Sequence, residues 1–220
     1  MSKGSALIVG VGPGLGLALA QTFARDGHPV ALFGRNAGRL ENYASELIAE
    51  GRTAGAYQAD AADPASLRTA LARAADDLGA PEVLIYNATL MGPDTPTDVD
   101  AQKLAHTLAV NVTGAVISAQ TILPLLPGGR GSLLFTNGAL AVDPSPEYTS
   151  LSLSKAALRN YVQALHTQQQ GRGIHVATVT VDGYIGGEDP RFAPDRLAAA
   201  VLDLHHQPQD EWQAELLLYP

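Results

Sequence analysis

Residues 5–20, SALIVGVGPGLGLALA, predict the strand–turn–helix unit around which the rest of the chain is organised. The apolar run at 6–9 is long enough for a buried strand and too short for a helix. Glycines follow at positions 10, 12, 14 and 16, and Leu15, Leu19 and Phe23 then recur at the i, i+4 spacing of a helix. Such a turn presents free backbone N–H groups and the positive end of a helix dipole at one point, which suits a phosphate group.

The glycine spacing is G-x-x-x-G-x-G, and it fits neither G-x-G-x-x-G nor a G-x-x-x-x-G-K loop. One alternative is a glycine-rich turn that binds nothing. Because a strand precedes the glycines and a helix follows them, we predict that the loop binds the diphosphate of a dinucleotide. The predicted loop residues are Gly10, Gly12, Pro13, Gly14, Leu15 and Gly16.

Composition limits the class of protein. The 220 residues are 46% apolar and 16% charged, which is typical of one globular domain over residues 1–220. The net charge of −8, from 14 Lys+Arg against 22 Asp+Glu, makes nucleic acid an unsuitable partner. With no cysteine and six scattered histidines, we predict no disulfide and no metal site. We find no secretory segment and no apolar run near the ~18 residues of a membrane span, so we expect no membrane contact and a cytoplasmic location.

Strand and helix signals alternate along the whole chain. Asp63-Pro64 is a strong helix start, with Asp63 as N-cap and Pro64 at the first helical position. This alternation predicts an α/β fold: a doubly wound, mostly parallel Rossmann-type sheet of about seven strands in a three-layer sandwich. The expected strands are 6–9, 29–33, 53–58, 82–86, 131–136, 174–181 and 214–218, and the later helices include 37–51, 98–126, 145–170 and 194–206.

Five markers in register resemble the short-chain dehydrogenase/reductase family over essentially the whole chain. They are Gly10-x-x-x-Gly14-Leu15-Gly16, Asp60 after the third strand, Tyr86-Asn87-Ala88 after the fourth, Asn111 in the long helix, and Lys155-Ala156-Ala157-Leu158 in the next helix. Each match is weak alone, but five in order on the expected elements indicate this family.

The resemblance implies roles for several residues. Asp60 would accept a hydrogen bond from the adenine amino group, Lys155 would hold the nicotinamide ribose hydroxyls, and Asn111 would brace an active-site water. Without the resemblance, these three would be a strand-end carboxylate, a surface lysine and a packed amide. Tyr86 and Thr89 depart from the family's usual N-N-A-G. The further residues expected at the cofactor are Ala61, Asn87 and Ala88, and, after the sixth strand, Asp182, Gly183 and Ile185.

The end of the second strand predicts the choice of cofactor. An acidic residue there would bind a ribose 2′-hydroxyl and repel a 2′-phosphate, but the sequence is Leu32-Phe33-Gly34-Arg35-Asn36. Arg35 and Arg39 are four residues apart, and guanidinium groups suit a phosphate. The alternative is a pair of ordinary surface arginines with Glu41 nearby. We therefore predict NADP(H) in preference to NAD(H).

The resemblance fails at the catalytic positions. Leu151 stands four residues before Lys155, where the family has tyrosine, and Gly138 stands at the position of the family's serine. Neither can donate a proton. If the helix begins by Ser145, Tyr148 shares a face with Leu151 and Lys155 and could supply the proton. A second candidate is Tyr184, and Asn137 and Ser152 are weaker candidates for orienting a substrate oxygen.

These observations predict an NADP(H)-dependent oxidoreductase with an atypical catalytic site, acting on a small carbonyl or alcohol. The predicted catalytic residues are Lys155, Asn111 and Tyr148. One alternative is an NADP(H)-binding protein without redox activity, such as a regulatory or silent subunit, and another is a non-redox isomerase or lyase. The short loop at 182–194 favours a shallow pocket, weakly shielded from water. The resemblance also implies a homodimer or homotetramer formed through the long helices.

Overall fold

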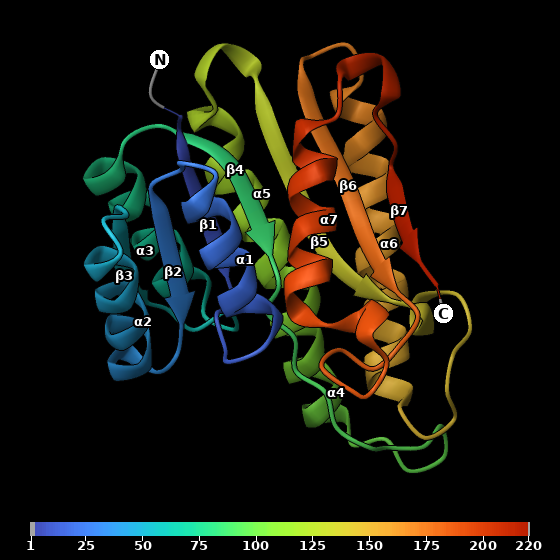
Figure 1. Cartoon of the computed structure of the whole chain (residues 1–220). Helices are drawn as coiled ribbons and strands as arrows, with labels where there is room; N and C mark the ends of the chain where they lie inside the picture. The colour runs from blue at the N-terminus through green and yellow to red at the C-terminus, as the bar shows by residue number, and fades with distance from the viewer. Residues whose placement is uncertain (1–2, 220) are drawn as a thin grey trace.

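The computed structural model describes residues 3–219, and all seven strands lie in one sheet. The strand order is β3-β2-β1-β4-β5-β6-β7, and every neighbouring pair is parallel (Figure 1). The chain builds outward from β1 to β3 and then crosses back to β4, so the winding direction reverses between β1 and β4. Ligands of such sheets bind outside the carboxyl ends of the strands at this reversal. The strands are β1 (Ser5–Val9), β2 (Val30–Gly34), β3 (Ala54–Gln58), β4 (Pro81–Tyr86), β5 (Gly131–Gly138), β6 (Ile174–Val181) and β7 (Glu215–Leu218).

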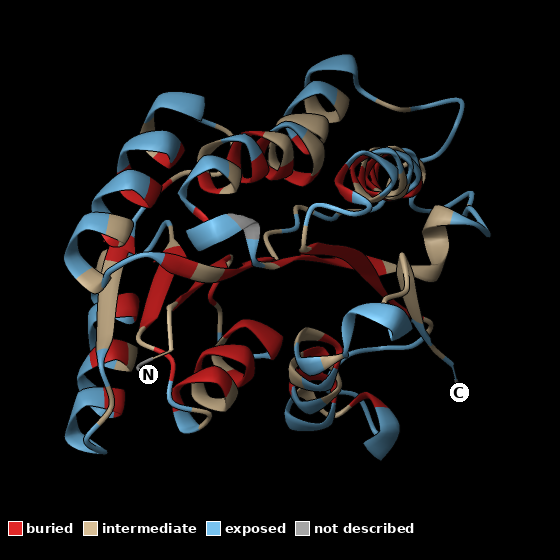
Figure 2. Cartoon of the chain, turned by 90° about the horizontal axis from the view of Figure 1, so that it is seen from above, coloured by how far each residue is buried: buried red, intermediate tan, exposed pale blue. Residues whose placement is uncertain are grey.

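Helices cover both faces of the sheet (Figure 2). One face packs against α1, α2 and α7, and the other packs against α3, α5 and α6. This arrangement confirms the predicted doubly wound, three-layer α/β fold. The helices are α1 (Leu15–Arg25), α2 (Ala37–Ala49), α3 (Pro64–Leu78), α4 (Ala101–Leu108), α5 (Gly114–Ile122), α6 (Thr149–Gln169) and α7 (Pro194–His206).

The apolar run of β1 serves both helix layers. Ala6 and Ile8 face the layer of α1, whereas Leu7 and Val9 face the layer of α3, and all four are buried. Successive strand residues point to opposite faces, so a strand that is covered on both sides must be apolar throughout. Leu19, like its helical neighbours on the same stripe of α1, is buried against this sheet as predicted.

Side-chain caps define the starts of two helices beside the cavity, α3 and α2. Asp63 accepts hydrogen bonds from the backbone N–H groups of Ala65 (2.9 Å) and Ser66 (3.2 Å), with Pro64 at the first helical position. The predicted start of α3 is therefore confirmed. Asn36 caps α2 in the same way, accepting from the N–H of Arg39 at 3.0 Å. These caps satisfy N–H groups that a helix cannot bond internally.

The long helix predicted over 98–126 is present as one helical run, Ala101–Leu125, but its centre is not α-helical. A π-helical turn, Ala109–Thr113, separates α4 from α5, and a 3-10 turn follows at Leu123–Leu125. The hydroxyl of Tyr86 donates to the backbone carbonyl of Val110 inside the π turn. Interactions with β4 therefore widen this turn, which the helical periodicity of the segment does not reveal.

The segment Ala101–Leu125 also has the length and apolarity of a membrane span, with a mean hydropathy of 1.5 in its most apolar window. Among the residues that the structure describes, it is the one helical run that does. Ala115, Ala119 and Ile122 are fully buried against the sheet and neighbouring helices. Packing in the sandwich therefore accounts for part of this apolarity, since 39% of the window is buried.

Helix α6 begins at Thr149, so the predicted start at Ser145 is wrong. Tyr148 has φ −138° and ψ 53° and lies outside the helix. The cap comes from a distant part of the chain, since the carboxylate of Asp94 accepts from the N–H of Ser150 at 3.0 Å and from its hydroxyl. The backbones pair as well: Asp94 N donates to Glu147 O (3.0 Å), and Thr149 N donates to Asp94 O (3.2 Å). The loop after β4 thereby fixes the start of α6.

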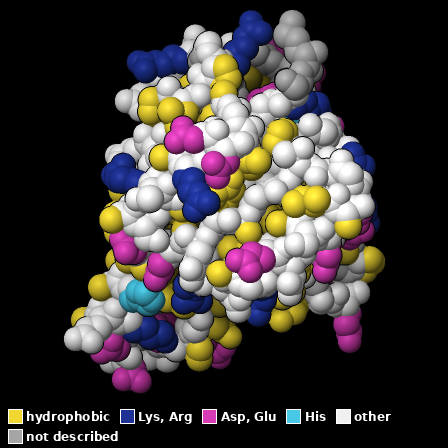
Figure 3. All heavy atoms as spheres, turned by 90° about the vertical axis from the view of Figure 1, so that its left-hand side faces the viewer, with side chains coloured by type: hydrophobic (Ala, Val, Ile, Leu, Met, Phe, Trp, Pro, Cys, Tyr) yellow, Lys and Arg dark blue, Asp and Glu magenta, His cyan; other side chains and the backbone are white. Residues whose placement is uncertain are grey.

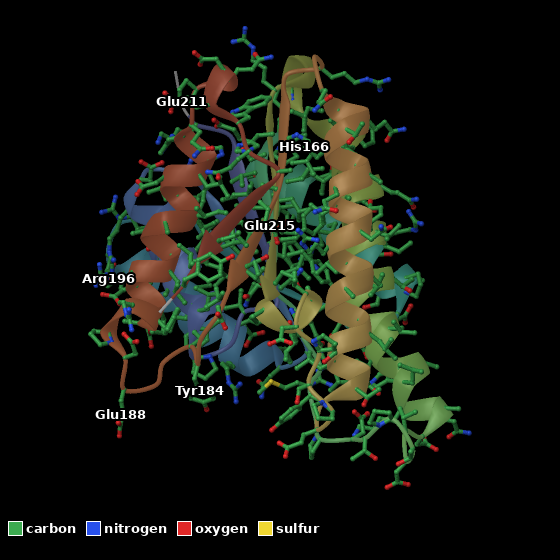
Figure 4. The ribbon with its side chains drawn as sticks, turned by 90° about the vertical axis from the view of Figure 1, so that its right-hand side faces the viewer. His166, Tyr184, Glu188, Arg196, Glu211 and Glu215 are labelled. Atoms are coloured by element: carbon green, nitrogen blue, oxygen red, sulfur yellow. The ribbon has the colours of Figure 1, made fainter. Side chains whose placement is uncertain are left out.

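Polar contacts attach β7, the edge strand, to the rest of the sandwich. Glu215, labelled in Figure 4, accepts from Arg159 of α6 (2.6 Å to Nη2) and from the hydroxyl of Thr180 on β6 (2.6 Å).

On the face of the molecule seen in Figure 3, positive and negative side chains are interspersed, without a broad basic area. This mixture agrees with the acidic net charge.

Candidate functional site

The glycine loop is shaped by close backbone contacts at two of its glycines. Gly10 follows directly after β1 with φ +98°, and a Cβ there would lie 2.5 Å from the Cα of Ala88. A Cβ on Gly16 would lie 2.5 Å from the carbonyl oxygen of Gly10 and 2.8 Å from the Cα of Val11. Both positions therefore require glycine, because the obstructing atoms belong to the backbone. They hold the first turn of α1 against the end of the sheet.

The other two glycines face open space. Neither Gly12 nor Gly14 would place a Cβ within 4 Å of any heavy atom. The N-terminus of α1 has no side-chain cap and no acidic residue in its first turn. Its free N–H groups are therefore available above Gly12 and Gly14, where a bound anion would satisfy them.

A cavity of about 760 Å³ opens beside this loop, at the carboxyl ends of β1 to β4. Its wall also includes the start of α2 and a residue of the π-helical turn, Val110. This is the edge at which the winding of the sheet reverses. Among the residues predicted to bind a cofactor, those that line the cavity are Gly10, Gly12, Arg35, Asp60, Ala61, Asn87 and Ala88.

The other residues predicted at the cofactor lie elsewhere. Pro13, Gly14, Leu15 and Gly16 form the turn into α1, next to the cavity wall, and Lys155 lies behind the wall. After β6 the chain folds on itself: Gly186 N donates to Phe192 O (3.0 Å), and Tyr184 and Glu188 stand in this loop (Figure 4). This segment supplies no residue to the cavity wall, and it contains Asp182, Gly183 and Ile185.

Asn87 ties the end of β4 to the glycine loop. Its Nδ2 donates to the carbonyl of Gly10 at 2.9 Å, and its Oδ1 accepts from the hydroxyl of Thr136 on β5 at 3.1 Å. The side chain thus links three neighbouring strand ends beneath the cavity. Asp60 lies across the cavity, where its carboxylate accepts from the N–H of Ala62 at 2.9 Å. This bond leaves the carboxylate acceptor capacity toward the cavity.

Arg35, Asn36 and Arg39 form the rim of the cavity beyond β2. The cap on α2 brings the two arginines together, because Asn36 accepts from the N–H of Arg39 while Arg35 precedes it directly. Within residues 3–219, neither guanidinium forms an ion pair. Asp60 is the one acidic residue of the wall, so the rim has the positive charge that a phosphate requires.

Lys155 is almost completely buried, with 8% of its surface exposed. Its ammonium donates to the hydroxyl of Thr89 at 3.1 Å and to the carbonyl of Thr136 at 3.3 Å. Burial removes the hydration of the ammonium and lowers the pKa of Lys155 to about 8. The alternative interpretation of Lys155 as an ordinary surface lysine is therefore excluded.

Asn111 holds the loop after β4 against the two long helices. Its amide accepts from the N–H of Leu90 (2.6 Å) and donates to the carbonyl of Leu90 (2.9 Å) and to the hydroxyl of Ser154 (2.8 Å). Asn111 is 1% exposed. One amide hydrogen thus braces the loop that carries Thr89, and the other bonds α6.

The predicted helical face of Tyr148, Leu151 and Lys155 is wrong at Tyr148, because α6 begins one residue later. Tyr148 lines a separate hollow of about 390 Å³ together with Asp94 and Glu147. Leu151 is buried in the first turn of α6, and Gly138 ends β5.

Three further candidates for substrate contact have clear positions. Tyr184 is 77% exposed. The hydroxyl of Ser152 donates to Tyr148 O (2.9 Å) and accepts from Ser145 N (3.2 Å), which closes the turn before α6. Asn137 donates to Lys155 O at 3.3 Å, and its Oδ1 is buried without a hydrogen-bond donor. Of these side chains, Asn137 alone retains a free buried acceptor next to Lys155.

Sequence reasoning missed several residues of the wall. Thr89 was noted only as a departure from N-N-A-G, yet it contacts both the cavity and Lys155. A hydroxyl three residues beyond the carboxyl end of β4 is a signal that could identify it. The other missed wall residues, mostly apolar, gave no comparable signal: Val9, Val11, Phe33, Gly34, Ala59, Leu67, Leu90 and Val110.

The sequence profile of the short chain dehydrogenase family matches residues 5–185. A curated relative, 2-(S)-hydroxypropyl-CoM dehydrogenase 3 of Xanthobacter autotrophicus, is 28% identical over 96% of this chain and 87% of its own length. The chain also spans 66% of a glucose 1-dehydrogenase of Gluconobacter oxydans at 28% identity.

Solved structures agree with these matches. A short chain dehydrogenase of Burkholderia cenocepacia in complex with NADP has a TM-score of 0.86 at 29% identity, covering 98% of this chain and 95% of that one. A blue fluorescent protein from a metagenomic library, in complex with NADPH, has a TM-score of 0.87 at 25% identity over 99% and 97% of the two chains. The profile match spans most of the chain, from β1 to the loop after β6, and the chain therefore belongs to the short-chain dehydrogenase family.

Proposed function

We propose that this protein is an NADP(H)-dependent oxidoreductase that acts on a small carbonyl or alcohol. The observation that carries the proposal is the continuous site formed by the open space at Gly12, the uncapped start of α1 and the cavity with Arg35 and Arg39 at its rim. The NADP and NADPH complexes of related structures support the choice of ligand.

The residues present fit a dinucleotide. Gly12 and Gly14 leave room for a diphosphate at the free N–H groups of α1, and Asp60 offers acceptors to an adenine amino group. Arg35 and Arg39 offer donors to a ribose 2′-phosphate. We assign the remaining ribose to the side of the cavity where Thr89 and, behind it, Lys155 lie. When bound, the nicotinamide supplies the hydride, and the protein supplies position and the accompanying proton.

The arginine rim predicts selective binding of NADPH over NADH. In the double variant Arg35→Ala/Arg39→Ala, the Kd for NADPH should rise about 10- to 100-fold, because charge-assisted hydrogen bonds to a phosphate are worth about 1.5–3 kcal/mol. The Kd for NADH should change less than about threefold, because that cofactor has no 2′-phosphate. Isothermal titration calorimetry measures both.

Arg68→Ala, an exposed change on α3, is the matched control and should leave both Kd values unchanged. Equal weakening of NADH and NADPH in the double variant would show that the arginines do not distinguish the two cofactors. If the wild-type protein binds neither cofactor, the proposed function is wrong.

A second candidate function is NADP(H) binding without redox chemistry. The observation that favours it is the side chains at the family's tyrosine and serine positions, Leu151 and Gly138, neither of which donates a proton. In that case NADPH raises the melting temperature by simple linkage, while no carbonyl in a panel oxidises it. NADPH absorbance, followed with the same panel, distinguishes the two functions.

We also propose that the protein is a symmetric homo-oligomer. In the isolated chain, Leu125 beyond α5 is 40% exposed and Leu153 on α6 is 49% exposed. Only 39% of the apolar window in Ala101–Leu125 is buried, which leaves apolar surface for a second copy. Light scattering after size exclusion should give a dimer or tetramer in the wild type and smaller species in Leu153→Glu. A monomeric wild type would contradict the proposal.

A further inference from the structure

Lys155 has no charged partner. Within the described residues no carboxylate lies within ion-pair distance of its ammonium, and its two partners are the hydroxyl of Thr89 and a backbone carbonyl, that of Thr136. A buried ammonium held only by neutral acceptors releases its proton more easily than a hydrated one. Its pKa of about 8 fits this surrounding.

Thr89 connects this amine to the cavity. Thr89 lines the cavity wall, whereas Lys155 does not, and the distance from Lys155 Nζ to Thr89 Oγ1 is 3.1 Å. The hydroxyl can accept from the ammonium and at the same time donate its own hydrogen toward the cavity. Asn111 fixes the backbone beside it through Leu90, so the hydroxyl is held in place.

No tyrosine close to Lys155 is equally placed. The hydroxyl of Tyr86 donates to Val110 O, and burial raises the pKa of this phenol above its usual value. Tyr148 lines the separate hollow near Asp94, and Tyr184 is largely exposed. Leu151 occupies the position where the family has its tyrosine. Thr89 is therefore the hydroxyl that both faces the cavity and contacts a titratable group.

We propose that Thr89 is the catalytic proton donor of this site and that Lys155 resupplies its proton. This inference rests on the proposed oxidoreductase function. In the reducing direction, the substrate carbon gains hydride from the reduced nicotinamide, and the substrate oxygen gains the Thr89 hydroxyl proton. Thr89 Oγ1 takes a proton from Lys155 Nζ in the same step. The lysine is left as a neutral amine and regains a proton from water after the product leaves.

The hydrogen bond can be tested without any substrate. The chain has three lysines, Lys3, Lys103 and Lys155, so an NMR titration of 15N-labelled lysine side chains resolves each amine, and Lys155→Met assigns the third. In Thr89→Val the pKa of Lys155 should fall, because the ammonium loses an acceptor. In Thr89→Ser it should stay at the wild-type value. An unchanged titration in Thr89→Val would overturn the proposal.

The transfer itself is tested by single-turnover oxidation of NADPH with the most reactive carbonyl of a panel. In the wild type the rate constant should be level below pH 8 and fall tenfold per pH unit above it. Thr89→Val should lower the rate constant 100-fold or more and make it independent of pH. Thr89→Ser should restore the wild-type rate constant and its pH dependence. Thr178→Val removes a buried hydroxyl on β6, away from the cavity, and should behave as wild type.

Calorimetry with NADPH distinguishes a failure of the proposed oxidoreductase function from a failure of the Thr89–Lys155 proton relay. If wild type does not bind NADPH, the proposed function fails, and the NMR titration still reports the Thr89–Lys155 contact. If wild type binds and oxidises NADPH but Thr89→Val keeps the wild-type rate and pH profile, the proton relay alone is wrong. Loss of NADPH binding in Thr89→Val would assign the hydroxyl to cofactor binding and would also overturn the relay.

Discussion

Gly10→Ala is expected to destabilise the protein by roughly 3–5 kcal/mol and to abolish NADPH binding. Gly10 has φ +98°, a region that side chains rarely adopt, and the new Cβ would lie 2.5 Å from the Cα of Ala88. The opposing atoms are backbone at the end of β4, so neither strand can move without breaking the parallel pairing of β1 with β4. Urea denaturation measures the loss of stability.

Gly12→Ala is the matched control for this effect. Position 12 has no heavy atom within 4 Å of the added Cβ, so stability should stay within about 1 kcal/mol of wild type. The methyl group would nevertheless occupy the space that we assign to the diphosphate, and the Kd for NADPH should rise at least tenfold. A Gly12→Ala protein with wild-type affinity would contradict the placement of the diphosphate. A Gly10→Ala protein of wild-type stability would contradict the packing of β1 against the loop after β4.

The free energy of unfolding is expected to fall by about 2 kcal/mol as pH decreases from 6.5 to 4.5, because of His205 alone. His205 lies in the last turn of α7, near the amino end of β5, where its Nδ1 bonds the hydroxyl of Ser132 at 2.8 Å. Its ring also contacts the rings of Phe23, His28 and His206. Burial, with a smaller contribution from the two histidines, lowers the pKa of His205 from 6.5 to about 3.

The direction of this effect follows from proton binding. Above pH 6.5 the imidazole is neutral in both states, so it contributes no pH dependence. Between 6.5 and about 3 the unfolded chain binds a proton that the folded chain does not, and stability falls by about 1.4 kcal/mol per unit of decreasing pH. The charged groups that face the ring are Asp26, Lys3 and Glu82, with Glu82 Oε1 3.9 Å from Nε2.

Urea denaturation at several pH values measures this slope in the wild type and in His205→Gln. The variant is less stable at neutral pH because it loses ring packing. Its free energy of unfolding should nevertheless depend less steeply on pH, because unfolding of the variant takes up one proton fewer. His106→Gln, an exposed change on α4, should leave the slope unchanged. A slope that is equal in wild type and His205→Gln would contradict the prediction. Burial also lowers the pKa of His175, which stacks on Trp212, so a residual slope is expected in His205→Gln.

Short sequence patterns predicted the elements that lie closest to the point where the winding of the sheet reverses, between β1 and β4. The start of α3 followed from Asp63-Pro64, and the turn from β1 into α1 followed from its glycines, because each depends on residues that are neighbours in the sequence. The position of Arg35 and Arg39 at the rim could likewise be predicted from the sequence, because the end of β2 and the start of α2 are adjacent in the chain. A residue at the carboxyl end of a strand reaches this edge whatever the rest of the fold does.

Long-range contacts decided what local patterns did not predict. Asp94 caps α6 from 56 residues away, so no pattern around Ser145 could show that Tyr148 lies outside the helix. Tyr86 widens the helix at Val110 across a separation of 24 residues. In both places the backbone follows a partner that the local sequence does not contain.

The sequence by itself determined the parallel sandwich, its order of elements, and a glycine loop followed by a positive rim, because apolar periodicity and turn chemistry act over a few residues. Only the tertiary structure decided that Lys155 is buried, that Thr89 stands between it and the cavity, and that Tyr148 faces a different hollow. The reason is physical: burial and hydrogen-bond partners depend on which strand ends and helices meet in space, and β4, β5 and α6 meet at Lys155 from positions far apart in the chain.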